Sequence, residues 1–66
     1  MGKEKIKMYP YHPLQLLDST YIIIRLNVVK KQFECLGDIY TSKEACEEEV
    51  LLMNKESGPV ELEYEI

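Results

Sequence analysis

The sequence has too little histidine, cysteine and glycine to build the common catalytic, metal or nucleotide sites. His12 is the only histidine. We therefore expect neither a multi-histidine metal centre nor a catalytic triad. Cys35 and Cys46 have no neighbouring cysteine or histidine to complete a zinc site. The three glycines are isolated, so no phosphate-binding loop is present. We therefore expect no enzyme activity, no bound metal and no cofactor.

A disulfide framework and long apolar runs are also missing. Two cysteines are too few for a secreted domain of this size that is held together by disulfides. Apolar runs such as Ile22–Ile24 are far shorter than the ~18 residues that a membrane span needs. No apolar signal core follows the basic start of the chain. We expect a cytoplasmic protein with reduced thiols and no membrane segment.

The length and composition favour one small folded domain over residues 1–66. The chain has 66 residues, of which 45% are hydrophobic and 30% charged, values that are ordinary for a globular protein. A chain this short buries only about 60% of the surface that its unfolded form exposes. Stability should therefore be marginal, or be increased by a partner.

What the chain has instead is charge that is sorted by position. Residues 1–33 carry six basic and two acidic side chains, a net charge of +4, whereas residues 34–66 carry two basic and ten acidic side chains, a net charge of −8. A field of this kind selects binding partners and does not perform a reaction. It favours a protein partner with a basic surface.

Residues 20–40 have the pattern of a β-hairpin. Residues 20–29 are rich in β-branched and aromatic types, and Ile22, Ile24, Leu26 and Val28 would share one face. A polar break at Lys30 precedes a second alternating segment, in which Phe33, Cys35 and Ile39 lie on one side. Glycine within this second strand predicts a bulge or a close backbone approach.

A helix is expected from Thr41 to about Lys55. Thr41 and Glu44 have the spacing of a capping box, and Gly58-Pro59 ends the helix, because glycine is common just past a helix end and proline cannot continue one. Its apolar stripe would contain Ala45, Cys46, Val50, Leu52 and Met53. Residues 60–66 then alternate as a half-buried strand, whose apolar side includes Ile66 and whose edge could pair with a second copy in a homodimer.

The N-terminal third allows two interpretations. Ile6 and Met8 alternate with polar residues, which suits a short strand at residues 5–9 beside the last strand. Pro13 could open one or two helical turns. The predicted fold is therefore α+β, a small antiparallel sheet with one main helix packed on one face. Residues 20–66 form a ββαβ core behind an N-terminal arm or first strand at residues 1–19, or the whole chain is a miniature βαββαβ fold with a stunted first helix.

The candidate partner-binding residues are the acids of the helix and last strand together with one leucine that departs from the stripe. They are Glu44, Glu47, Glu48, Leu51, Glu61, Glu63 and Glu65. Glu49 falls inside the apolar stripe, where it is either partly buried or reaches Arg25. His12 is expected in an exposed loop, and the two cysteines are expected to face each other as core filling.

The sequence leaves three functions open: a protein-binding module, a single-stranded nucleic-acid binder and an uncharacterised structural or accessory subunit. The order of elements in residues 20–66 resembles, in length and topology only, many small phage and mobile-element proteins that bind and inhibit a host enzyme, including bacteriophage inhibitors of bacterial RNA polymerase. This resemblance implies a small acidic protein-binding module, which is our leading prediction. The alternative is a single-stranded nucleic-acid binder that uses the basic N-terminal half with Tyr9, Tyr11 and Tyr21, although the acidic half would repel phosphate.

Overall fold

The computed structural model describes residues 2–65 and shows an α+β protein with two separate antiparallel sheets and one helix. The strands are β1 (Lys3–Met8), β2 (Tyr11–Gln15), β3 (Tyr21–Asn27), β4 (Gln32–Tyr40) and β5 (Val60–Glu65), and the helix is α1 (Lys43–Ser57). This confirms the predicted fold class. Ile66, which was expected to complete the apolar side of the last strand, lies outside the described residues.

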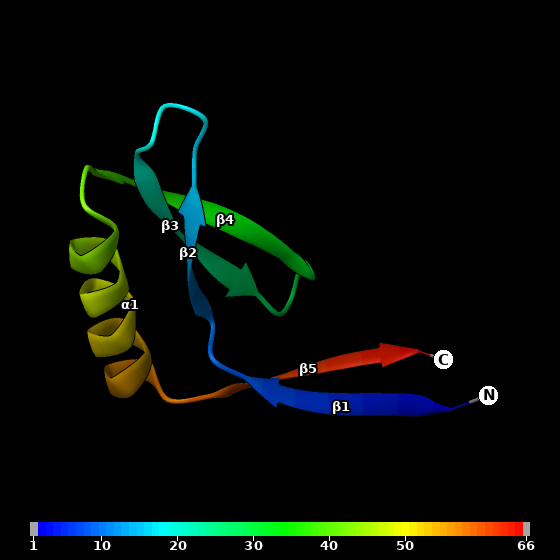
Figure 1. Cartoon of the computed structure of the whole chain (residues 1–66). Helices are drawn as coiled ribbons and strands as arrows, with labels where there is room; N and C mark the ends of the chain where they lie inside the picture. The colour runs from blue at the N-terminus through cyan, green and yellow to red at the C-terminus, as the bar shows by residue number, and fades with distance from the viewer. Residues whose placement is uncertain (1, 66) are drawn as a thin grey trace.

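Strands β2, β3 and β4 form a three-stranded sheet in that order, with α1 on one face (Figure 1). The predicted hairpin is confirmed as β3 and β4, but β3 ends at Asn27, earlier than expected. The Asn27 side chain accepts hydrogen bonds from the backbone N–H groups of Val29 and Lys30 and thereby fixes the turn. The predicted bulge is present around Gly37, where the register shifts opposite Ile23 and the glycine φ is 93°.

The core lies between β3 and α1, and it uses the opposite side of β3 from the one we predicted. Ile23 is 2% exposed and packs with Cys46 and Val50 of the helix. Because side chains alternate along a strand, Ile22 and Ile24 point to the other face. The sequence does not separate these faces, since three consecutive isoleucines satisfy either alternation.

The short helix considered at Pro13 does not form, because residues 11–15 are strand β2. His12 pairs with Ile24 and Pro13 with Ile23 in an antiparallel register with β3. Proline is tolerated here because β2 is an edge strand, whose outer N–H positions need no partner in the sheet. His12 is therefore half-buried in a strand and does not lie in an exposed loop.

Strands β1 and β5 pair with each other, which was one of the interpretations of the N-terminal third that the sequence left open, and together they form a separate two-stranded arm. The last strand thus does not join the sheet of the hairpin. No Cα atom of the arm lies within 8 Å of a Cα atom in another strand or in the helix. Figure 1 shows β1 and β5 side by side, extending away from α1.

Helix α1 begins one residue later than the capping-box pattern predicted. Ser42, not Thr41, is the N-cap: its backbone is extended, with φ −120° and ψ 127°, and its Oγ accepts from the N–H of Ala45 at 3.3 Å. The prediction that Thr41 caps the helix in a capping box with Glu44 was therefore wrong, and the neighbouring Ser42 supplies the capping oxygen. At the other end Gly58, with φ 72°, donates its N–H to the carbonyl of Asn54 at 2.8 Å, which confirms the predicted stop.

Replacing the cap should therefore weaken the fold at Ser42 and not at Thr41. We expect Ser42→Ala to lower the free energy of unfolding by about 1 kcal/mol, because an N–H group of the first helical turn loses its acceptor. Thr41→Ala is the matched control and should change it by less than about 0.5 kcal/mol. Urea denaturation measures both, and an equal loss in the two variants would show that Thr41 shares the capping role.

Candidate functional site

The side of α1 that faces away from the sheet combines two leucines with acids. Leu51 is 69% exposed and Leu52 is 57% exposed. At 100° per residue they lie on either side of the line through Glu48 and Lys55. We call this surface the outer helix face; its residues are Glu44, Glu48, Leu51, Leu52, Lys55 and Glu56. The prediction that Ala45 and Leu52 belong to the buried stripe was wrong, because both are exposed. Met53 packs against the core as predicted, and Asn54 also lies against the sheet.

The predicted acids of the last strand do not join this surface. Glu61, Glu63 and Glu65 stand opposite Lys7, Lys5 and Lys3 in the register of β1 with β5. Lys3 Nζ also lies 3.3 Å from Glu63 Oε1. Cross-strand pairs of opposite charge reduce the field of both partners, so one side of the arm is a mixed, nearly neutral surface. The predicted set is therefore divided. Glu44, Glu48 and Leu51 lie on the outer helix face, Glu47 lies where α1 meets β2 and β3, and the three acids of β5 lie on the arm. The uncompensated acidity remains on α1.

Glu49 is exposed and is not paired with Arg25. Arg25 instead binds Glu34 across β3 and β4, with 3.2 Å between Nη2 and Oε1. The hydrogen bond to Arg25 lowers the pKa of Glu34, and the same bond raises the pKa of Arg25. This pair is exposed to solvent and holds the two strands in register, so neither residue is free to serve as a catalytic group.

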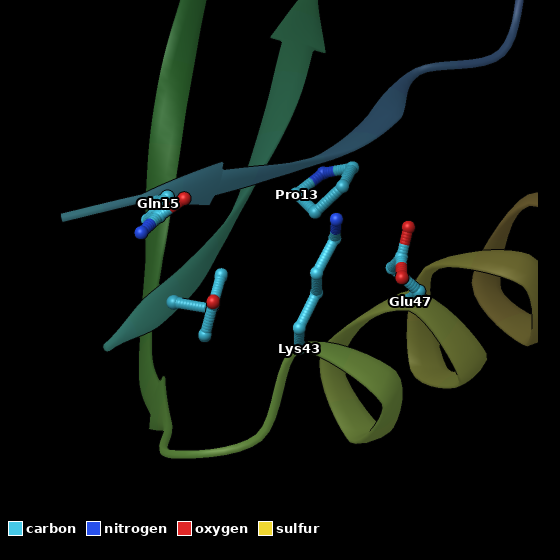
Figure 2. A pocket seen from close by; sticks show the side chains of 5 residues that line it. Pro13, Gln15, Lys43 and Glu47 are labelled. Atoms are coloured by element: carbon cyan, nitrogen blue, oxygen red, sulfur yellow. The ribbon is translucent and has the colours of Figure 1, made fainter. Parts of the chain in front are cut away.

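A small open hollow lies where the start of α1 meets β2 and β3. It is lined by Pro13, Gln15, Tyr21, Lys43 and Glu47 and has a volume of about 110 Å³. In Figure 2 the Lys43 side chain extends from the helix toward Pro13, with Glu47 one turn further along. Pockets that enclose a drug-sized ligand measure roughly 300–1,000 Å³. The hollow is therefore smaller than the pockets that enclose a drug-sized ligand.

The two cysteines lie on opposite faces of the three-stranded sheet, which corrects the prediction that they face each other. Cys46 on α1 is fully buried, and its thiol points to the carbonyl oxygen of Ile22 at 3.7 Å. Burial raises the pKa of this thiol, with a smaller contribution from Glu47. Cys35 on β4 is exposed. The buried thiol is a core group with low reactivity, because the reactive form is the thiolate.

The tyrosines on which the nucleic-acid alternative depends are mostly structural. Tyr11 and Tyr21 pack against the core formed by Ile23, Cys46 and Val50, and Tyr9 alone among the three is largely exposed, at 52%. The lysines nearest to them in the sequence are those of β1, which stand opposite glutamates. A stacking platform needs exposed aromatic faces beside free positive charge, and this part of the chain offers little of either.

An apolar surface that was not predicted from the sequence lies on the face of the three-stranded sheet opposite to α1. Cross-strand neighbours share a face, so the register brings Leu14, Ile22 and Ile39 together, and His12, Ile24 and Cys35 beside them. Phe33 follows opposite Leu26, and its ring meets that of His12 edge to face at 5.7 Å. We call these residues the open sheet face. The signal in the sequence was the unbroken run of isoleucines, which is typical of a strand with apolar residues on both faces.

Several residues of the open sheet face are strongly exposed. Ile39 is 66% exposed, Phe33 48% and Leu14 43%. His12 Nε2 is buried and has no hydrogen-bond partner among residues 2–65. Helix α1 covers only the other side of this sheet. A contiguous apolar surface of this kind in a protein usually marks an interaction site.

Comparisons with known proteins identify no relative. No protein-family model, curated protein or solved structure matches this chain.

Within residues 2–65, no three histidine, cysteine, aspartate or glutamate side chains gather closely enough to hold a metal ion. The helix found in that part of the chain lacks the length and apolar character needed to cross a membrane.

Proposed function

We propose that this protein is a small binding module that docks the outer helix face of α1 on a basic surface of another protein. The observation that carries the proposal is the exposure of Leu51 and Leu52 among glutamates on a helix whose opposite side is buried. Exposed leucines act as apolar anchors when a partner removes them from water. Surrounding charges act mainly on the rate of encounter and on the choice of partner.

The charge distribution supports a basic partner. Residues 43–57 carry five glutamates and two lysines, and the acids of β5 are compensated by β1. Negative potential is therefore concentrated over the helix, where it steers a positively charged surface toward Leu51 and Leu52. The resemblance in length and topology suggests that the partner is a host enzyme that the module regulates. A cytoplasmic location is part of the proposal and is supported by the unpaired thiols Cys35 and Cys46.

The experiment compares retention of partner proteins by matched variants. Immobilised wild-type protein and Leu51→Ala/Leu52→Ala are incubated with lysate of the source cell, and bound proteins are quantified by mass spectrometry. Leu17→Ala/Val29→Ala is the control, since Leu17 and Val29 are fully or almost fully exposed in loops away from α1. We expect one protein to be retained by wild type and control and to be reduced at least tenfold by the helix variant. Equal retention by all three would place the binding surface elsewhere.

Charge removal should then slow association with the retained protein. Glu48→Gln/Glu56→Gln and Glu61→Gln/Glu63→Gln change the net charge by the same amount, the first on the outer helix face and the second on the arm. We expect the helix pair to lower the association rate several-fold at low salt, and the arm pair to leave it nearly unchanged, because only the helix acids are uncompensated. Surface plasmon resonance at two salt concentrations measures both. Slower association with the arm pair alone would contradict the proposal.

The nucleic-acid alternative has a separate test. Fluorescence anisotropy with a labelled single-stranded oligonucleotide should show no binding at moderate salt, because the lysines of β1 face glutamates. Tight binding that falls steeply with salt would favour the alternative over docking through α1.

A further inference from the structure

Two apolar surfaces of this protein keep strongly exposed side chains within residues 2–65. The first is the open sheet face. The second lies on the arm, where alternation places the apolar residues of β1 and β5 on one side, opposite the lysine and glutamate pairs. We call it the arm face; its residues are Ile6, Met8, Val60, Leu62 and Tyr64. Ile6 is 42% exposed and Tyr64 37%. An isolated two-stranded ribbon is marginally stable in water, so the arm needs a surface on which to pack.

The size of the molecule shows how much surface is left open. The accessible area of the chain is 5146 Å², whereas a compact monomer of 7.8 kDa is expected to expose about 4,400 Å². The excess of about 750 Å² is close to the ~800 Å² that each partner buries in a standard interface. The radius of gyration is 13.5 Å, against about 11 Å for a compact domain of this length. The chain has the proportions of one half of an assembly.

The charges indicate that the missing half is a second copy of the same chain. The molecule has a net charge of −4, which opposes self-association if the charges lie at the contact. The open sheet face contains no carboxylate or lysine, and Glu4, opposite Tyr64, is the one charged residue on the apolar side of the arm within residues 3–65. The uncompensated acids lie on α1, behind the sheet. Two copies can therefore meet through these surfaces with little repulsion.

The dimensions of the arm also fit. A six-residue strand is about 20 Å long, and three strands at about 4.8 Å spacing form a surface about 14 Å wide with its side chains. The arm is thus long enough to cross the whole open sheet face of a neighbour. In Figure 1 the arm runs away from α1.

We propose that this protein forms a two-fold symmetric homodimer in which the arm face of each copy covers the open sheet face of the other. Symmetry makes the exchange reciprocal, so both apolar surfaces of both copies are buried at once. This contact differs from pairing between the edges of two last strands, because it uses side chains and not backbone hydrogen bonds. It leaves the outer helix face of each copy exposed, and it uses none of the residues on which the proposed function depends.

Sedimentation velocity tests the assembly with the full chain. We expect wild-type protein to sediment as a dimer at micromolar concentration. Ile39→Glu on the sheet and Ile6→Glu on the arm should each weaken the dimer at least tenfold, because each places a charge in an apolar contact. Leu17→Glu is the matched control, since Leu17 is fully exposed in the loop between β2 and β3, and it should sediment as wild type does. Circular dichroism of each variant confirms that its fold is retained.

A wild-type protein that is monomeric at 100 µM overturns the proposal, and so does a dimer that Ile6→Glu leaves intact. The arrangement is tested by NMR on a mixture of isotope-labelled and unlabelled protein. We expect intermolecular contacts between methyl groups of Ile6 or Leu62 and the side chains of Phe33 or Ile39. Intermolecular contacts between two open sheet faces, or between two β5 strands, would replace the proposed arrangement. Leu51→Ala/Leu52→Ala should remain dimeric, so failure of partner binding and failure of dimerisation are distinguishable.

Discussion

Replacing Ile23 by alanine should remove most of the stability of this fold. Ile23 is 2% exposed and lies between Cys46 and Val50. Truncating a buried isoleucine to alanine costs about 2–5 kcal/mol, from lost burial and from the cavity that remains. A domain of this length has a total stability of roughly 3–10 kcal/mol. We therefore expect Ile23→Ala to be largely unfolded or to melt far below wild type in thermal and urea denaturation.

A graded series keeps this prediction measurable if the alanine variant does not fold. Ile23→Val removes one methyl group and should cost about 1 kcal/mol. Val29→Ala is the matched control, because Val29 lies in the turn after β3 and is 88% exposed, and it should stay within about 0.5 kcal/mol of wild type. If Ile23→Val and Val29→Ala have the same small effect, Ile23 does not face the helix.

Replacing Asn54 should have the second largest effect on stability. Asn54 Oδ1 accepts from the backbone N–H of Tyr11 at 2.9 Å, and Asn54 Nδ2 donates to the carbonyl of Tyr11 at 2.9 Å. The side-chain amide thus pairs with β2 as another strand would, and it ties the helix to the edge of the sheet. Without it, two partly buried backbone groups of Tyr11 lose their partners, at about 1–3 kcal/mol for each unsatisfied group.

We expect Asn54→Ala to lower the free energy of unfolding by about 2–4 kcal/mol. Asn54→Asp should lose a similar amount, because a carboxylate cannot donate to the Tyr11 carbonyl. Gln15→Ala, an exposed amide at the end of β2, is the control. Urea denaturation gives the stabilities, and hydrogen exchange at the Tyr11 amide gives a local measure. A Tyr11 amide that exchanges equally fast in wild type and Asn54→Ala would contradict the assignment.

The amide of Asn54 also explains how a chain with few fully buried side chains holds α1 in place. Among the described residues, the buried hydrophobic side chains are those of Ile23, Leu26, Cys46 and Val50. A helix packed through so small a contact surface can slide along the sheet, because apolar contact is not directional. Two hydrogen bonds of fixed geometry remove that freedom. The outer helix face is consequently held in one orientation, which the proposed docking through this face would use.

Local patterns in the sequence determined those helix ends and strands that depend on residues close together in the chain. Gly58-Pro59 ends α1, because glycine adopts a backbone with positive φ at lower cost than other residues. The alternation of apolar and polar residues predicted β1, β4 and β5. The sequence allowed but did not decide the antiparallel pairing of the first and last strands, in which lysines of one strand stand opposite glutamates of the other. Each of these conclusions depends on residues that are near in the chain or on a simple match of charges.

The tertiary structure alone decided which surfaces are buried. Ile22, Ile23 and Ile24 are equivalent in the sequence, and only the position of α1 makes Ile23 the core residue and leaves the other two on the opposite face. Pro13 lies in a strand because β3 supplies a neighbour along one edge, which outweighs its local preference. The separation of the acids of α1 from those of β5 depends on the arm standing apart from the sheet. Which residues are buried and which lie close together depends on contacts between segments that are distant in the sequence. A local sequence pattern does not determine these contacts.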